Sequence, residues 1–460
     1  MLEITDTAGP HSENCQGLRR RSLLKAGALS ALGLTTPGLK RLQAATGSPD
    51  NGKSVILLWL DGGPSQLETY DPKPDASSEY RGPWGDLDTN VPGIRFSSML
   101  PLHAGHADKM CVLRSVHHDT GDHFAAAHWM LTGRFGATAA NKKPTSPSVG
   151  SCVAKLTEAT QPGMPTYVGL PAAHSVYIYP GYMGSAYLGP GFDPFQVNMK
   201  QKYMSAVYKA DIQPPPFLES MSGDAQRSLT RMSLLESLDH LDRTIDQSGV
   251  MSSMDGFQQK AVDMLIRGPA RQAFDMGQED AVTRDRYGRG PWGHYTLMAR
   301  RLVESGVRFV TVDMPHWDTH SRIKTGLEAR LPYLDMAVDG LMTDLAERSL
   351  LDDVLVVIMG EFGRTPRLNS GQAGIPIPGR DHWGSAMSVV MAGGGLRTGQ
   401  VVGATNSKAE HPISSPLRPD DVLATIYHVL GIDYRHIQFT DYSGRPVSML
   451  DGGNPIAQII

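Results

Sequence analysis

Cysteine is scarce in this chain: 460 residues contain three, Cys15, Cys111 and Cys152. None of them belongs to a C-x-x-C motif, and three cysteines permit at most one internal disulfide, so a disulfide-built fold is excluded. We expect Cys15 to leave with a leader peptide and the other two thiols to be unpaired. With 40% hydrophobic residues, a chain of this length buries a large core without such crosslinks.

An excess of charge of one sign is also absent. Lys and Arg number 43 and Asp and Glu number 47, which gives a formal net charge of -4. Sequence-independent binding to a phosphate backbone needs a basic field, so no nucleic acid is expected as a partner. The apolar stretch near the N-terminus, 26–34, is short and rich in Gly and Ala, so we expect no permanent membrane span.

The first 45 residues predict an export signal. Residues 19–25, Arg-Arg-Arg-Ser-Leu-Leu-Lys, are similar to the twin-arginine consensus, and the apolar stretch and the small pair Ala44-Ala45 follow in order. We therefore predict a signal segment over 1–45, export by the twin-arginine machinery and a periplasmic or otherwise exported location. Because that pathway carries folded proteins, a metal can be loaded before export.

Continuous apolar runs predict strands that are buried on both faces of a mostly parallel sheet. They occupy residues 55–60, 110–116, 307–312, 354–359 and 386–392. Helical patterns with one apolar stripe occupy 292–305, 331–348 and 419–432. This alternation predicts an α/β fold with helices on both faces of a central sheet.

One section of the chain departs from this pattern. Residues 167–216 are rich in Tyr, Gly and Pro without periodicity, which predicts long surface loops. Residues 228–245 then show an amphipathic helical pattern. We predict a single domain over 46–460 that carries a helical and loop insertion at about 175–290.

Polar side chains follow or precede the apolar runs, where ligands collect in parallel sheets. In chain order they are Asp61; His117, His118, Asp119, Asp122, His123 and His128; Asp313, His316, Asp318 and His320; Glu361; and Asp381 and His382. Carboxylates and imidazoles are the ligands that divalent metals prefer. Any one of these residues is accounted for by turns and helix caps, but their recurrence predicts a metal site.

Three short motifs carry most of this signal. Asp318-Thr-His320 spaces two possible ligands so that both point the same way in an extended loop. In Gly360-Glu-Phe-Gly-Arg-Thr-Pro366, Glu361 ends a strand, and Arg364 is expected to clamp an anionic oxygen or to pair with Glu361. In Arg380-Asp-His-Trp-Gly384, Asp381 is placed to orient His382 for metal binding or proton transfer.

These residues resemble the alkaline phosphatase and sulfatase superfamily, and most closely a twin-arginine-exported bacterial family of sulfatase-like proteins. The segment 55–63 looks like the superfamily's first strand and its metal-binding Asp, and Leu131-Thr-Gly-Arg134 looks like the end of a sulfatase helix. The segment 354–363 looks like the late strand that ends in an acidic ligand. The resemblance implies an alkaline-phosphatase-like fold and these metal ligands: Asp61, Asp318, His320, Glu361 and His382.

Two residues depart from the superfamily pattern. The position of the sulfatase nucleophile, a Cys or Ser in C/S-x-P-x-R, falls close to His123, so no formylglycine can form there. Phe362 stands where relatives keep a second late metal ligand. Both departures concern the reaction and not the fold.

The leading hypothesis is hydrolysis of a phosphate or sulfate ester assisted by zinc, manganese, calcium or magnesium. His123 is then a base or a further ligand, His382 a leaving-group acid or a ligand, and Ser65 or Thr120 an alternative nucleophile. Expected substrates are small anionic esters or sulfated or phosphorylated glycans. A group of tryptophans is placed to line a sugar cleft or the core: Trp59, Trp129, Trp317 and Trp383. The competing hypothesis is a binding or scaffold protein on a degenerate hydrolase fold.

Overall fold

The computed structural model describes residues 51–172, 174–175, 179–180, 182–197 and 268–460. Residues Gly52–Ile460 form one compact unit. Both internal cysteines in these ranges, Cys111 and Cys152, are buried free thiols, which confirms the expectation that they are unpaired. None of the helices in these ranges combines the length and the apolar character needed to cross a membrane.

An eight-stranded sheet forms the centre of the described part of the chain. Its strands, in spatial order, are β14 (Gln400–Val402), β4 (Met110–Val116), β13 (Met387–Gly393), β10 (Val354–Met359), β1 (Ser54–Trp59), β9 (Phe309–Asp313), β5 (Tyr167–Leu170) and β8 (Phe195–Gln196). Among these eight, β13 alone runs antiparallel to its neighbours. The predicted mostly parallel sheet and the strands at all five apolar runs are confirmed.

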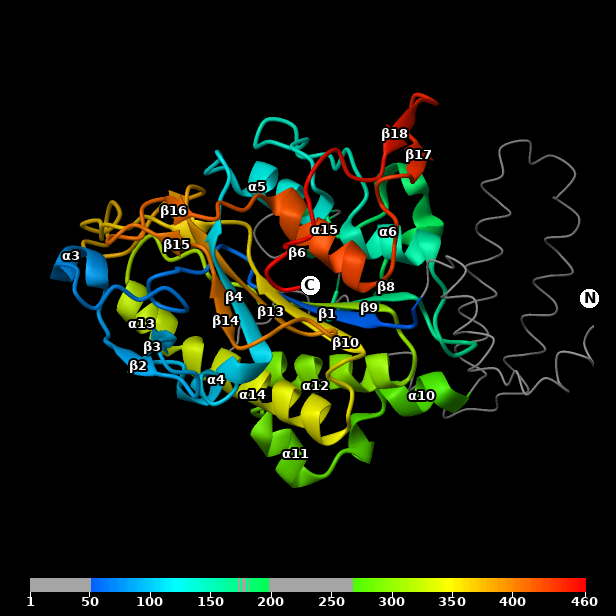
Figure 1. The fold of residues 1–460 in the computed structure, drawn as a ribbon, viewed down its shortest axis with the longest axis horizontal. Helices are drawn as coiled ribbons and strands as arrows, with labels where there is room; N and C mark the ends of the chain where they lie inside the picture. Colours follow the sequence, from blue (N-terminus) through cyan, green and yellow to red (C-terminus); the bar gives the residue numbers. More distant parts are fainter. Residues whose placement is uncertain (1–50, 173, 176–178, 181, 198–267) are drawn as a thin grey trace, which may run out of the picture. The chain divides into compact units, whose positions relative to one another are not determined.

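Helices cover both faces of this sheet, as predicted for an α/β fold (Figure 1). Alternate side chains of each strand point to opposite faces, so Ile56 and Leu58 pack in one core and Val55 and Leu57 in the other. The first face carries α12 (Pro291–Glu304) and α14 (Leu331–Glu347), and the second carries α5 (His123–Thr132), α6 (Val149–Leu156) and α15 (Pro419–Val429).

Shorter elements complete the unit. They include α3 (Ser78–Arg81), α4 (Pro101–Ala104), α10 (Gly268–Phe274), α11 (Ala281–Arg286), α13 (Ile323–Glu328), and the small antiparallel pair of β11 (Gly363–Arg364) and β12 (His382–Trp383). β11 and β12 follow β10 and precede β13 in the chain, and they form a separate two-stranded sheet.

The register of the central strands brings distant residues to one edge. Trp59 at the end of β1 pairs with Met359 of β10 on one side and with Asp313 of β9 on the other. The three parallel strands therefore end together, and the loops that follow them are neighbours. Because β13 runs in the opposite direction, the residues that precede it, including His382, lie at the same edge.

One sequence-based expectation is wrong. Residues 167–216 were expected to be surface loops, but β5 is a fully buried strand that pairs with β9 and with β8. Its four residues, Tyr-Val-Gly-Leu, are too short a run to stand out beside the Gly and Pro around them. The predicted helix at 228–245, most of the insertion and the whole signal segment lie outside the described residues.

Candidate functional site

The loop that follows β9 is held against the end of β1 by main-chain hydrogen bonds. The Asp61 amide donates to the Met314 carbonyl at 3.1 Å, and the Trp317 amide donates to the Asp61 carbonyl at 3.0 Å. Gly62, at φ 111°, permits this contact, because a Cβ there would lie 2.6 Å from the Asp318 nitrogen. The double glycine after Asp61 therefore lets the Asp318 loop close over the strand end.

Asp318 accepts hydrogen bonds from side chains of three other segments. Its Oδ1 lies 2.7 Å from Arg364 Nη2, 3.0 Å from His320 Nε2 and 3.1 Å from His382 Nε2. Its Oδ2 lies 3.5 Å from His123 Nε2. Burial alone would raise the pKa of Asp318, but the three imidazoles and the Arg364 charge hold it well below its usual range. We call these five residues the Asp318 cluster.

Three members of the Asp318 cluster have the geometry of a metal site. Ligand atoms of His123, Asp318 and His382 all lie within 4.8 Å of one another, and no other group of three or more such residues is found in the described ranges. The three side chains are 16–21% exposed, so solvent reaches them. Two imidazoles and one carboxylate with an open side are the donor set of a catalytic zinc site.

Groups behind the imidazoles fix their orientation. His123 Nδ1 lies 2.8 Å from Glu361 Oε1, and His382 Nδ1 lies 2.8 Å from the Gly121 carbonyl, so both Nε2 atoms face Asp318. Histidines that bind metals are usually held by a carboxylate or carbonyl in this way. The Phe362 ring stacks on His382 at 4.5 Å and contacts His123 at 4.8 Å. Phe362 thus forms a wall beside the two imidazoles.

His123 occupies the first turn of α5, where Asp122 caps the helix by accepting from the amides of Phe124 and Ala125 at 2.8 and 3.2 Å. Burial and the helix N-terminus both disfavour a positive imidazole there. Burial lowers the pKa of His123, but its hydrogen bonds to Asp318 and Glu361 and their charges outweigh burial and raise this pKa to about 9. Without metal, His123 is therefore a cation at neutral pH.

This pKa predicts how the stability of the metal-free protein depends on pH. The folded-state pKa of His123, about 9, lies above the ordinary value of 6.5. The stabilisation, at most about 3 kcal/mol, is fully present below pH 6.5 and is lost as the pH rises through about 9. Urea unfolding of chelator-treated protein from about pH 6 to pH 10 measures it. In His123→Gln the free energy of unfolding is expected to lose this dependence on pH. An equal pH dependence in both proteins would contradict the raised pKa of His123.

Three buried carboxyl groups lie beside the Asp318 cluster. Glu361 and Asp61 are 0% exposed and Asp313 is 3% exposed. The Gly62 amide donates to both Glu361 oxygens, at 2.9 and 3.2 Å. Burial, together with the charges of Asp61 and Glu361, raises the pKa of Asp313 well above its usual range. Asp313 Oδ1 has no hydrogen-bond partner among the described residues. We call Asp61, Asp313 and Glu361 the acidic cluster.

The structure groups the sequence-predicted ligands in two sets. Asp318 and His382 share one metal-compatible group with His123, which was expected to be a base or a further ligand. Asp61 and Glu361 belong to the acidic cluster, and Glu361 joins the two sets through His123. His320 contacts Asp318 and, through Nδ1 at 2.6 Å, Asp381. Asp313, the last residue of β9, was noted among the polar residues at the strand ends but was not among the predicted ligands.

Arg364 pairs with Asp318, and not with Glu361 as one prediction held. Its guanidinium is fully buried and donates to the carbonyls of Gly63 at 2.8 Å and Arg380 at 3.2 Å, and also to that of Gly62. These three carbonyls and Asp318 accept from four of its N–H groups, so Arg364 ties the Gly62–Gly63 turn to Asp318. In this geometry Arg364 fixes the carboxylate.

Several other candidate residues form hydrogen bonds with groups outside the Asp318 cluster. His118 Nε2 lies 2.6 Å from the Glu361 carbonyl, and His128 Nδ1 lies 2.6 Å from the Arg134 carbonyl. Burial lowers the pKa of both imidazoles, that of His128 to about 4. The Ser65 hydroxyl, a candidate nucleophile, is buried and donates to Glu68, while Thr120 Oγ1 accepts from the Asp122 amide at 3.1 Å.

The tryptophans divide between core and surface. Trp59 and Trp317 are 0% exposed, so they belong to the core and cannot line a sugar cleft. Trp129 and Trp383 are partly exposed. The sugar-cleft interpretation is therefore wrong for the two buried rings.

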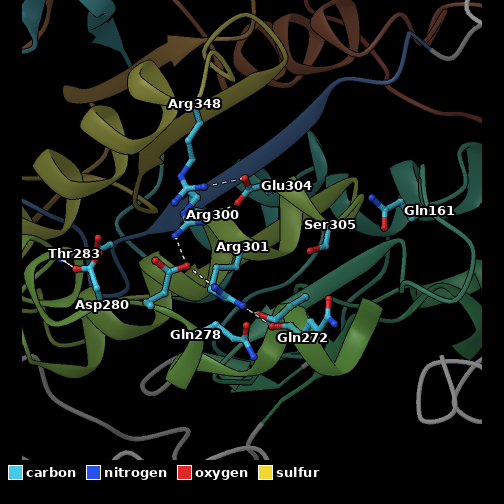
Figure 2. Close-up of a pocket in the computed structure, with 12 residues that line it drawn as sticks. Gln161, Gln272, Gln278, Asp280, Thr283, Arg300, Arg301, Glu304, Ser305 and Arg348 are labelled. Atoms are coloured by element: carbon cyan, nitrogen blue, oxygen red, sulfur yellow. Dashed lines mark hydrogen bonds and ion pairs between the residues drawn. The ribbon is translucent and has the colours of Figure 1, made fainter. Parts of the chain in front are cut away.

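A polar cavity of about 610 Å³ is lined by Ser305, which precedes β9, whereas Asp318 follows β9 (Figure 2). It lies beside the C-terminal end of α12, where Arg300 contacts Glu279 at 2.6 Å and Glu304 at 2.6 Å, and Arg348 contacts Glu304 at 3.0 Å. Its arginines are thus paired with carboxylates of the cavity wall.

Comparisons with known proteins give a family and several similar folds. A family profile described as "Protein of unknown function (DUF1501)" matches residues 52–460. No curated protein matches the chain. Similar solved structures include the PsFucS1 sulfatase from Pseudoalteromonas sp., with 13% identity over 86% of this chain and 70% of that one, at a TM-score of 0.36.

Two further structures are named for phosphorus chemistry. The phosphonate monoester hydrolase of Agrobacterium radiobacter has 11% identity over 88% of this chain and 77% of its own, at a TM-score of 0.38. Alkaline phosphatase from the Antarctic bacterium TAB5 has 12% identity over 76% of this chain and 94% of its own, at a TM-score of 0.30. At such scores these likenesses bear on neither reaction nor substrate, so the chemistry assigned below comes from this chain's own residues.

Proposed function

Because this chain belongs to the DUF1501 family, whose description assigns no function, we propose from its own residues that it is an exported, metal-dependent hydrolase of a phosphate or sulfate ester. The observation that carries this proposal is the convergence of His123, Asp318 and His382 on one point. Export is supported by the Arg19-Arg20-Arg21 motif of the sequence.

The three converging side chains suit a divalent cation, and zinc matches the donor set best. A divalent ion held there would polarise a nonbridging ester oxygen and lower the pKa of an attacking water. Glu361 and the Gly121 carbonyl hold the two imidazoles by their Nδ1 atoms, which turns each Nε2 toward Asp318, where the ion would bind. Arg364 keeps Asp318 in place by its contact at 2.7 Å.

His320 is the remaining imidazole at the site, and we assign it proton transfer to the leaving oxygen. The hydrogen bond to Asp318 raises the pKa of His320, and the bond to Asp381 adds to this effect, so both contacts favour the protonated ring. It is 23% exposed, which permits contact with a substrate. His320 would donate its proton to the leaving alkoxide and regain one from the attacking water, so that water and the ester yield the free acid and an alcohol.

The test combines metal content and turnover of protein recovered from the periplasmic fraction. We expect a stoichiometric divalent ion, and hydrolysis of at least one of an aryl phosphate, an aryl phosphodiester or an aryl sulfate. A chelator should abolish turnover and the ion should restore it, while His382→Ala should lose both. His436→Ala, which alters an imidazole that is 83% exposed, should change neither. Turnover that survives chelation would overturn the proposal, and metal binding without turnover would favour the binding-protein alternative.

A further inference from the structure

An ion pair between Glu68 and Arg380 lies buried behind the site. The two side chains are 2% and 0% exposed. Arg380 Nη2 lies 2.7 Å from Glu68 Oε1, and Nε lies 3.1 Å from both carboxylate oxygens. The other donors reach the carbonyls of Tyr80 at 2.8 Å, Thr365 at 3.0 Å and Pro366. All five N–H groups of the guanidinium therefore have acceptors.

The main chain of Arg380 is part of the support of the Asp318 cluster. Its amide donates to the Thr319 carbonyl at 3.0 Å, between Asp318 and His320. Its carbonyl accepts from Arg364 Nη1 at 3.2 Å, and Arg364 Nη2 contacts Asp318. The next two residues in the chain are Asp381, which holds His320, and His382. A displacement of Arg380 is therefore transmitted to both sides of the candidate metal site.

The partner of Arg380 comes from the segment that follows Asp61. Within this segment, Gln66 forms two hydrogen bonds with the main chain of Arg364. Its Oε1 accepts from the Arg364 amide at 2.9 Å, and its Nε2 donates to the Arg364 carbonyl at 3.0 Å. Glu68 also accepts from the Ser65 hydroxyl. Gly82 packs on the pair so closely that a Cβ there would lie 2.2 Å from Glu68 Oε1. One short segment thus holds both arginines.

A buried ion pair contributes little stability beyond what apolar residues of the same volume provide, because both charges lose their hydration. A bidentate pair with all donors used does, however, hold the joined segments in one relative position. We propose that Glu68 and Arg380 are positioning residues that fix the separation of Asp318 from His382 and thereby set metal affinity. This inference rests on the proposed metal-dependent function, and it assigns the pair no contact with the substrate.

Arg380→Lys is the main test variant, because it keeps the charge that balances Glu68 and loses the five-donor fork. We expect Co²⁺ affinity to fall roughly 10-fold to 100-fold, as for other changes behind metal ligands. The visible absorption bands of bound Co²⁺ should shift, and kcat should fall while KM changes little. Glu68→Gln, which keeps the shape of the side chain, serves as a second variant if Arg380→Lys does not fold.

Glu279→Gln provides the matched control, because it removes a carboxylate from the buried Arg300, which lines the polar cavity (Figure 2). It should lower thermal stability but leave Co²⁺ affinity, spectrum and kcat unchanged. If Arg380→Lys and Glu68→Gln also lower only stability, the pair is merely structural and the inference is overturned.

A readout without metal separates this inference from the proposed function. In the metal-free protein, the imidazole N–H resonances of His123 and His382 report their hydrogen bonds to Glu361 and Gly121. We expect these resonances to shift or broaden in Arg380→Lys and not in Glu279→Gln. If wild-type protein binds no Co²⁺, the proposed function fails. Unchanged resonances in the variant then overturn the positioning role as well, and changed ones support it.

Discussion

Replacing Asp318 with asparagine is expected to abolish metal binding and turnover while the chain stays folded. The carboxylate is 21% exposed and is the acceptor shared by Arg364 and three imidazoles, so it is the one group that all other members of the Asp318 cluster contact. Asparagine has the same shape and still accepts from Arg364, but it lacks the charge that binds a cation.

The expected loss of metal affinity in Asp318→Asn can be bounded from the effect of changing groups behind a metal ligand. Altering groups behind a ligand costs roughly 10-fold to 100-fold in metal affinity, so loss of the ligand should exceed about 100-fold. Isothermal titration with Zn²⁺ and kcat/KM for the best aryl ester measure both effects. Asp433→Asn, which alters an exposed carboxylate paired with a histidine, is the control. An Asp318→Asn protein that keeps wild-type zinc affinity would contradict the role given to Asp318.

Replacing Glu361 with alanine is expected to have the largest effect on stability. Glu361 is fully buried, accepts from the Gly62 amide and holds His123 Nδ1 at 2.8 Å. Its removal leaves both donors buried without an acceptor, at a cost of about 3 to 5 kcal/mol in the free energy of unfolding at neutral pH. Relief of its repulsion with Asp313 offsets part of this loss.

Urea unfolding of the two metal-free Glu361 variants distinguishes charge from hydrogen bonding. Glu361→Gln keeps an acceptor for Gly62 and is expected to lose less stability than Glu361→Ala. Both variants should lower the pKa of His123 toward 6.5, because one of its two partner carboxylates is gone. A Glu361→Ala protein as stable as the wild type would show that neither donor depends on this carboxylate.

Much of the fold was predictable because buried parallel strands are uniformly apolar. The run 354–359 predicts β10 with its observed limits, and 55–60 predicts β1 to within one residue. The antiparallel direction of β13 was not predictable from its own apolar run, since burial on both faces leaves the same pattern in either direction. β5 was missed because a four-residue strand with Gly169 carries almost no periodic signal.

The sequence predicted where the site lies in the fold, but not which side chains contact each other there. The rule that ligands collect at strand ends selected Asp61, Asp318, Glu361 and His382, which all lie at one edge of the sheet. Side-chain partners depend on the course of loops that have no periodicity, so the pairing of Arg364 with Asp318 had no signature in the sequence. His123 was expected to be a base or a further ligand, and the structure places it in the metal-compatible group.

Anomalous X-ray scattering at the zinc absorption edge tests the central claim most directly. Crystals of the protein with stoichiometric Zn²⁺ are expected to show a peak between His123, Asp318 and His382, about 2.0 to 2.2 Å from each coordinating atom. Soaking with a chelator should remove it. A peak held only by other residues, or a fully zinc-exposed crystal with no density among these three side chains, would contradict the assignment of this cluster as a metal site.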